Sequence, residues 1–197
     1  MSRLTIVETV GSDHHPFDRL IGWTDSWAAT HLNDIELSVQ HGTARAPLHG
    51  EAMAYLPHPT LMRLMESADV VVTQGGPMGI VETRRMGLKP IVVPRLKAFG
   101  EVVDDHQVDL CRRLADRGDI WLAEDERALH AALDAAIADP SVLRFDPVDA
   151  EAGVEESVAR FAAVVANLPS RSGPLAWFTS RKRGSRSHDS HERPSPQ

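Results

Sequence analysis

The stretch 68–94, ADVVVTQGGPMGIVETRRMGLKPIVVP, constrains the fold more than any other part of the sequence. Residues 69–73 form a β-branched run that is too short for a helix and apolar on both faces, which favours a buried parallel strand. Gln74-Gly75-Gly76 interrupts the run, and we expect its glycines to supply the positive-φ backbone of a tight turn. Pro77 stands at the first position of the helix that follows, where its missing N–H has no cost. A second apolar run, 91–93, predicts the next strand.

The turn at the start of this helix is a candidate anion site. A helix N-terminus presents unpaired N–H groups at the positive end of its dipole. Glycines at 75, 76 and 79 leave room for a phosphate against the backbone. Glu82 lies about one and a half turns into the helix, so its carboxylate can reach the pocket edge and accept hydrogen bonds from the hydroxyls of a ribose. A plain strand–helix turn with a solvated Glu82 stays open as an alternative, because the spacing matches neither the dinucleotide fingerprint nor a P-loop.

The other apolar segments alternate between strand and helix patterns, which predicts an α/β domain with a doubly wound, Rossmann-like parallel sheet. Ligands of such sheets bind at the carboxyl ends of the strands. Four polar or glycine-rich loops should meet there: at Gly11-Ser12, at His41-Gly42, at 74–79 and after Pro94. The remaining predicted strands are 4–10, 35–40, 52–56 and 120–122, and the remaining predicted helices are 17–29, 61–67, 106–117, 125–139 and 154–168.

Length and composition exclude some classes of function. The chain has 197 residues and a formal net charge of −7, which suits one folded domain and argues against an extended nucleic-acid surface. Its one cysteine, Cys111, allows no intrachain disulfide and suggests no cysteine-based zinc site. We see no signal sequence and no apolar run near the ~20 residues that span a bilayer, so we expect a cytoplasmic protein. The folded domain should cover 1–169, followed by a disordered, polar tail at 170–197 with a basic patch at 181–183.

Three segments carry a resemblance to a known family. They are GS-x₃-PF-x-RL from Gly11, the block 68–95 with its glycine turn, glutamate and KPIVVPR strand, and FGEVVDDHQ from Phe99. In this order and spacing they resemble the C-terminal domain of glycosyltransferase family 28. Within that group the chain looks most like the short stand-alone members of the Alg13 and PssE type, and the similarity covers roughly 4–138.

The resemblance implies a single GT-B C-terminal-type domain, like the C-terminal half of MurG-like enzymes, that holds a UDP-sugar such as UDP-GlcNAc. By position, Glu82 matches the acid that binds the ribose hydroxyls, and Gln107 is the best candidate for the hydroxyls of the sugar. The residues carried over for the donor nucleotide are Gly11, Ser12, Gln74, Gly75, Gly76, Pro77, Met78, Gly79 and Glu82, and those for the donor sugar are Asp105, His106 and Gln107.

The implied reaction is an inverting hexosyl transfer without a bound metal or other cofactor. The start of the helix at Pro77 and nearby backbone N–H groups would stabilise the departing UDP. The adjacent Asp104-Asp105 pair is not the spaced Asp-x-Asp of metal-dependent transferases.

The acceptor and its general base lie largely in the other half of two-domain relatives. The implied partner is therefore an Alg14-like or PssD-like membrane-anchored subunit. It would hold this chain at the inner face of the plasma membrane, to build a lipid-linked saccharide or an exopolysaccharide.

Several residues keep two interpretations. His14-His15 is either a solvated pair or a contact to the acceptor, with His14 the candidate catalytic base. A metal site at 104–106 is disfavoured because no helical metal motif accompanies it. Trp23 and Trp27 suit a core or interface better than sugar stacking, and Lys97 is either a phosphate contact or free.

One residue divides the functional interpretations. Gln74 stands where similar proteins often carry a histidine. The chain is therefore either the catalytic donor-binding subunit of a split transferase or a non-catalytic subunit that binds a nucleotide sugar or serves as a scaffold. A GT-B epimerase is a more distant third reading, because such enzymes need both domains in one chain.

Overall fold

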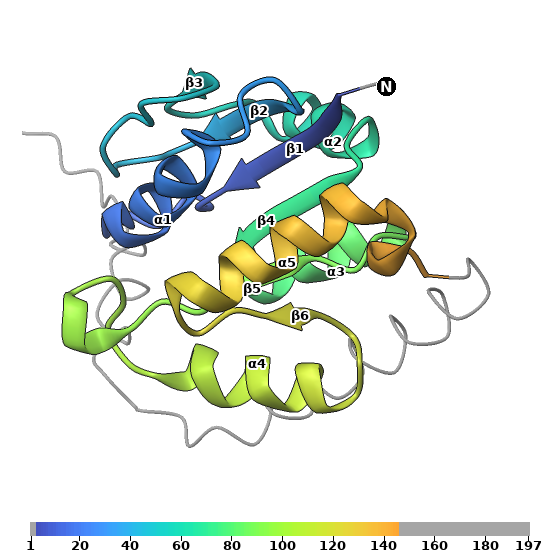
Figure 1. The fold of residues 1–197 in the computed structure, drawn as a ribbon. Coiled ribbons are helices and arrows are strands. Elements are labelled where there is room, and N and C mark those ends of the chain that lie inside the picture. The colour runs from blue at the N-terminus through green and yellow to red at the C-terminus, as the bar shows by residue number, and fades with distance from the viewer. Residues whose placement is uncertain (1–2, 146–197) are drawn as a thin grey trace, which may run out of the picture. The chain divides into compact units, whose positions relative to one another are not determined.

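The computed structural model describes residues 3–145, which form an α/β domain built on one six-stranded parallel sheet (Figure 1). The predicted helix 154–168, the domain boundary at 169 and the tail 170–197 lie outside the described residues. The strands are β1 (Leu4–Thr9), β2 (Ile35–Gln40), β3 (Glu51–Met53), β4 (Val70–Gln74), β5 (Ile91–Val93) and β6 (Trp121–Leu122). The helices are α1 (Asp18–Ala28), α2 (His58–Glu66), α3 (Pro77–Arg85), α4 (His106–Asp116) and α5 (Glu126–Ala138), with short 3₁₀ turns η1 (Lys97–Phe99) and η2 (Pro140–Leu143).

The strand order is β3-β2-β1-β4-β5-β6, and every neighbouring pair is parallel. The predicted doubly wound sheet is therefore confirmed. The chain first builds outward from β1 to β3 and then returns to place β4 on the other side of β1. At such a reversal the connections after the two central strands leave on opposite faces, which opens a crevice at their carboxyl ends. In this domain the reversal lies at the loops that follow β1 and β4, and we call this edge of the sheet the crevice.

Helices cover both faces of the sheet, as Figure 1 shows. On one face, α1 and α5 pack through Leu20 and Leu133 against side chains such as Ile6 and Val72. On the other face, α2 packs on Val7 and Val71. The same face also holds α3 and α4, whose Ile80, Cys111 and Leu114 meet Val92. Among residues 3–145, none of the helices combines the length and apolar character that a membrane span needs.

Two predicted elements differ from the observed ones at the edge of the sheet. The predicted strand 52–56 is instead the short β3, Glu51–Met53. The carbonyl of Ala54 accepts hydrogen bonds from the Gly42 backbone N–H and from Nε2 of Gln40 instead of pairing in the sheet. Helix α2 begins at His58, three residues before the predicted 61. Pro59 does not exclude this earlier start, because it sits in the first turn, where a helix needs no N–H donor.

One of the central strands, β1, carries a buried acidic side chain. Glu8 of β1 is fully buried, and neither carboxylate oxygen makes a hydrogen bond of normal geometry among residues 3–145. Burial raises the pKa of Glu8 to about 8, the nearby Asp25 charge adds to the rise, and the neighbouring Thr24 hydroxyl opposes it. Since a buried carboxylate without partners is costly, the side chain is held mostly as the neutral acid at pH 7.

The buried Glu8 makes stability depend on pH in a defined direction. Its pKa is about 8 when folded and 4.5 when the carboxyl is exposed, so the folded state binds more protons between these values. The stabilisation is complete below pH 4.5 and is lost as the pH rises through 8. We expect Glu8→Gln to remove this loss, which amounts to several kcal/mol, roughly 3–5, in urea unfolding measured from pH 5 to 9. Equal pH slopes for wild type and variant would contradict the assignment.

Candidate functional site

The loops after β1 and β4 meet at the carboxyl edge of the sheet. Gly11, with φ +80°, needs the left-handed backbone that glycine adopts freely. A Cβ placed on Gly11 would lie 3.3 Å from Nε2 of Gln74, so the two loops are in contact. Gln40 at the end of β2 donates from Nε2 to the Gly11 carbonyl at 3.1 Å, and its Oε1 pairs with the Thr9 hydroxyl. The first-strand turn is thereby tied to the neighbouring strand ends.

The glycines of the β4–α3 turn are required by space and not by positive φ, which corrects the reason given from the sequence. Gly76 is the N-cap of α3 and has an ordinary extended backbone, with φ −76°. A Cβ on Gly75 would lie 2.8 Å from Sγ of Cys111, and one on Gly76 would collide with the Gln74 amide. A Cβ on Gly79 would lie 2.8 Å from the Thr73 hydroxyl. The turn is thus crowded by the side chains of Cys111, Gln74 and Thr73.

The N-terminus of α3 has no capping side chain. Pro77 occupies the first turn, as predicted, and Met78 beside it is 64% exposed. Gly76 offers no side-chain acceptor to the first N–H groups of the helix. Beneath the turn, Oε1 of Gln74 is buried and has no hydrogen-bond partner among residues 3–145. A polar amide and an uncapped helix start therefore lie together at the crevice.

Glu82 lies on the second turn of α3 and is only 16% exposed. Its Oε1 accepts a hydrogen bond from Nε2 of His58, the first residue of α2, at 2.7 Å. Sequence reasoning did not predict this pair, because His58 stands 24 residues earlier and at the start of a different helix. The carboxylate of α3 is thus held by the first residue of the neighbouring α2.

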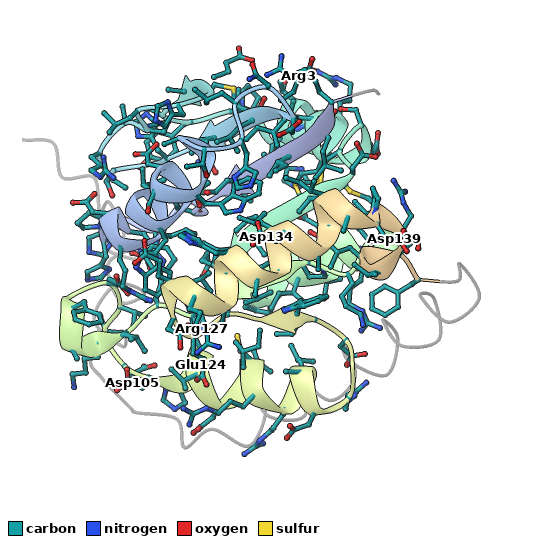
Figure 2. All side chains as sticks on the ribbon, viewed as in Figure 1. Arg3, Asp105, Glu124, Arg127, Asp134 and Asp139 are labelled. Atoms are coloured by element: carbon teal, nitrogen blue, oxygen red, sulfur yellow. The ribbon has the colours of Figure 1, made fainter. Side chains whose placement is uncertain are left out.

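The predicted donor-sugar segment is only partly brought to the turn. Gln107 is beside Gly75, and its Oε1 accepts from the Arg95 backbone N–H at 3.2 Å. Asp105 instead accepts from the backbone N–H of Lys97 at 3.0 Å, at the start of α4 (Figure 2). His106 is 79% exposed and pairs with Asp104 at 2.6 Å. Asp105 and His106 therefore contact their own loop, and only Gln107 joins the glycine turn.

The loop after β1 places its two histidines in different surroundings, and His14 as the catalytic base stays a prediction. His14 is 85% exposed, while His15 is 24% exposed and its Nδ1 lies 2.6 Å from Oδ1 of Asp13. The same oxygen accepts from the His15 backbone N–H at 2.8 Å. Slight burial raises the pKa of Asp13, but these hydrogen bonds and the Arg95 charge outweigh it and leave the pKa below its ordinary value. Ser12 in the same loop is exposed.

Arg95 is the residue of this edge that sequence reasoning missed. Its side chain is fully buried and donates to the carbonyls of Val10 at 2.8 Å, His15 at 2.8 Å and Glu101 at 3.0 Å. Its guanidinium lies over the Phe17 ring, 4.6 Å from the centroid. Burial lowers its pKa despite the opposing charges of Asp13 and Glu101. Nothing in a PR dipeptide at the end of a strand distinguishes such a residue from an exposed one.

The metal interpretation of 104–106 finds no cluster in the described part of the chain. There, the group whose ligand-type atoms come within 4.8 Å of one another is Asp13, His14 and His15. Within this group the Asp13 carboxylate is already hydrogen-bonded to His15. The expectation that no metal takes part stays a prediction.

The crowding at Gly75 gives a stability test. We expect Gly75→Ala to lower the free energy of unfolding by about 1–3 kcal/mol, because the new methyl overlaps the Cys111 sulfur and the Gln107 amide. The matched control is Gly22→Ala inside α1, where a Cβ meets only the flexible Arg45 end at 3.4 Å. That change should be neutral or stabilising by up to about 1 kcal/mol. Similar urea midpoints for the two variants would contradict the packing account.

Comparison with solved structures finds the same fold in glycosyltransferases. The crystal structure of the glycotransferase of kitacinnamycin has 20% identity and a TM-score of 0.56, over 84% of this chain and 43% of that one. MurG of Acinetobacter baumannii has 17% identity and a TM-score of 0.51, over 79% and 49%. The solution structure of ALG13 has 15% identity and a TM-score of 0.51, over 80% and 97%. This chain thus spans less than half the length of the first two proteins and nearly all of the third.

Sequence comparison identifies the family. No curated protein matches the chain. The model of the glycosyltransferase family 28 C-terminal domain matches residues 9–158, which is more than half of the 197 residues. The chain belongs to the family of glycosyltransferase family 28 C-terminal domains.

Proposed function

We propose that this chain is the donor-binding half of a split inverting glycosyltransferase. It binds a UDP-sugar, which is UDP-GlcNAc or a similar donor. The observation that carries the proposal is the uncapped start of α3, which opens at the crevice between β1 and β4 with Glu82 one and a half turns away. Unpaired N–H groups suit a diphosphate, and a carboxylate suits the hydroxyls of a ribose. Both features belong to α3, so one helix would contact both the diphosphate and the ribose.

The proposed chemistry relies on backbone dipoles. When the sugar departs to the acceptor, negative charge builds up on UDP. The start of α3 at Pro77 would stabilise that charge without a metal ion, because its N–H groups are fixed before the reaction. Gln107, which reaches the glycine turn, remains the best candidate for the sugar hydroxyls, with Asp105 and His106 at the edge of the same region.

A partner subunit is part of the proposal. The chain corresponds in length to ALG13 and to less than half of the two larger glycosyltransferases. The half of those two proteins that this chain does not match would correspond to a partner that supplies the acceptor site. An Alg14-like or PssD-like protein would take that role and hold the complex at the membrane. The general base is then supplied by the partner, or by the loop after β1 in this chain, which carries His14 and His15.

A second function has one observation in its favour. Gln74 replaces the histidine common in similar proteins, and its buried Oε1 has no partner among the described residues. A neutral amide cannot exchange protons as imidazole does. In this version the chain binds the nucleotide sugar and supports a complex without taking part in transfer. This second function would be favoured if the assembled complex binds the donor sugar nucleotide but transfers no sugar, and if Gln74→His restores the transfer.

The donor site is tested by calorimetric titration of the full chain with UDP and with UDP-GlcNAc. We expect saturable binding that Glu82→Ala weakens roughly ten- to a hundredfold, since a hydrogen bond to a charged group contributes about 1.5–3 kcal/mol. The matched control is Glu124→Ala, which removes an exposed carboxylate paired with Arg112 at 2.9 Å on another part of the surface. That variant should bind like wild type.

The titration also has outcomes that contradict the proposal. Equal losses in Glu82→Ala and Glu124→Ala would mean that the effect is general and not local to the ribose. Absence of binding by the chain alone calls for the same titration with a co-expressed membrane partner. Absence of binding in both would overturn the glycosyltransferase assignment of this site.

A further inference from the structure

The first residue of α2 touches the side chain on which the proposed nucleotide site depends. Nε2 of His58 lies 2.7 Å from Oε1 of Glu82. A carboxylate can only accept, so the imidazole nitrogen is the donor in this contact. His58 is 66% exposed and Glu82 is 16% exposed, so the pair links the first residue of α2 to the second turn of α3 near the surface.

From this geometry we infer that His58 is a positioning residue that holds Glu82 ready for the ribose of the donor. The inference rests on the proposed function and adds a determinant of its specificity. Oε1 is committed to His58, and Oε2 makes no hydrogen bond to any residue within 3–145. A carboxylate has lone pairs for about four hydrogen bonds, so acceptance from His58 leaves the second oxygen for the two ribose hydroxyls.

The backbone around His58 is unusually restricted, which suits a positioning role. Pro57, with φ −55°, precedes it as the N-cap of α2, and Pro59 follows it in the first turn. Proline fixes its own φ and narrows the choices of its neighbour. Met65 of α2 and the helix-end residue Met86 pack in one apolar cluster on the same face of the sheet. The imidazole N–H of His58 is therefore presented to Glu82 from a rigid backbone.

The alternative is a surface ion pair with no functional consequence. Exposed pairs contribute little to stability, and His58 is two-thirds exposed. A positioning role differs from this in one measurable property, the discrimination between ribose and deoxyribose. If Glu82 is free to rotate, binding of a ribonucleotide must order it, whereas 2′-deoxyuridine diphosphate gains less from that ordering.

The experiment titrates the full chain with UDP and with 2′-deoxyuridine diphosphate. In His58→Ala we expect UDP affinity to fall about three- to tenfold, with a smaller change for the deoxynucleotide, so that the ratio of the two affinities shrinks. His58→Gln should restore most of the ratio, because its amide N–H can reach the same oxygen. The matched control is Arg112→Ala, which breaks the exposed Arg112–Glu124 pair and should leave the ratio unchanged.

The outcomes separate this inference from the proposed function. UDP binding that depends on Glu82, with an unchanged ratio in His58→Ala, overturns the positioning role and leaves the donor site intact. Tighter UDP binding in His58→Ala would mean that the imidazole competes with ribose, and it also overturns the inference. If wild type binds no UDP, alone or with a partner, both the site and the role of His58 are wrong. Thermal unfolding of each variant confirms that the compared proteins are folded.

Discussion

The carboxyl edge of this domain depends on one buried cation. Arg95 follows β5 and donates to backbone carbonyls in three separate segments: the end of β1, the loop after it and the loop before α4. A buried guanidinium is tolerable only when its N–H groups are satisfied, and here most of them are. Its removal would leave three carbonyls at the crevice without their donor. The loop that carries Gly11 and the loop that leads to Gln107 are thus fixed relative to each other.

An ion pair on the neighbouring helix extends this connection outward from the buried cation. Arg19 of α1 makes two contacts with Glu101, at 2.9 and 2.8 Å, and donates to the Pro94 carbonyl at 2.8 Å. Glu101 is 3% exposed and also accepts from the Leu96 backbone N–H. Paired geometry of this kind holds a loop in one conformation. The long segment after β5 therefore follows a defined path across the edge of the sheet.

The sheet could be predicted from the sequence because short β-branched runs and helix periods alternate clearly, and the turn at 74–79 because glycine and proline mark it. Most features that could not be predicted from the sequence depend on contacts between distant residues. The end of β3 depends on the Ala54 carbonyl, which accepts from Gln40 and Gly42, and no local pattern records that. The start of α2 depends on Pro59 taking a place in the first turn. The His58–Glu82 and Arg95 contacts join residues far apart in the chain, so only the fold brings them together. Gly75 and Gly76 do lie in the predicted turn. Neighbouring atoms leave little room for a Cβ there, whereas the sequence had suggested a positive φ as the reason for glycine.

The chain's one cysteine lies directly under the glycine turn. Its Sγ approaches the Gly75 carbonyl at 4.0 Å, and burial, aided by the Glu124 charge, raises the pKa of the thiol to about 12. Thiolate is the reactive form, so this sulfur is protected from alkylation and from the first step of oxidation while the domain is folded. The molecule is consequently close to a natural cysteine-free background. A single cysteine introduced at an exposed position of the rim would carry a fluorophore or cross-linker there alone, and the native sulfur would become accessible only when the turn above it opens.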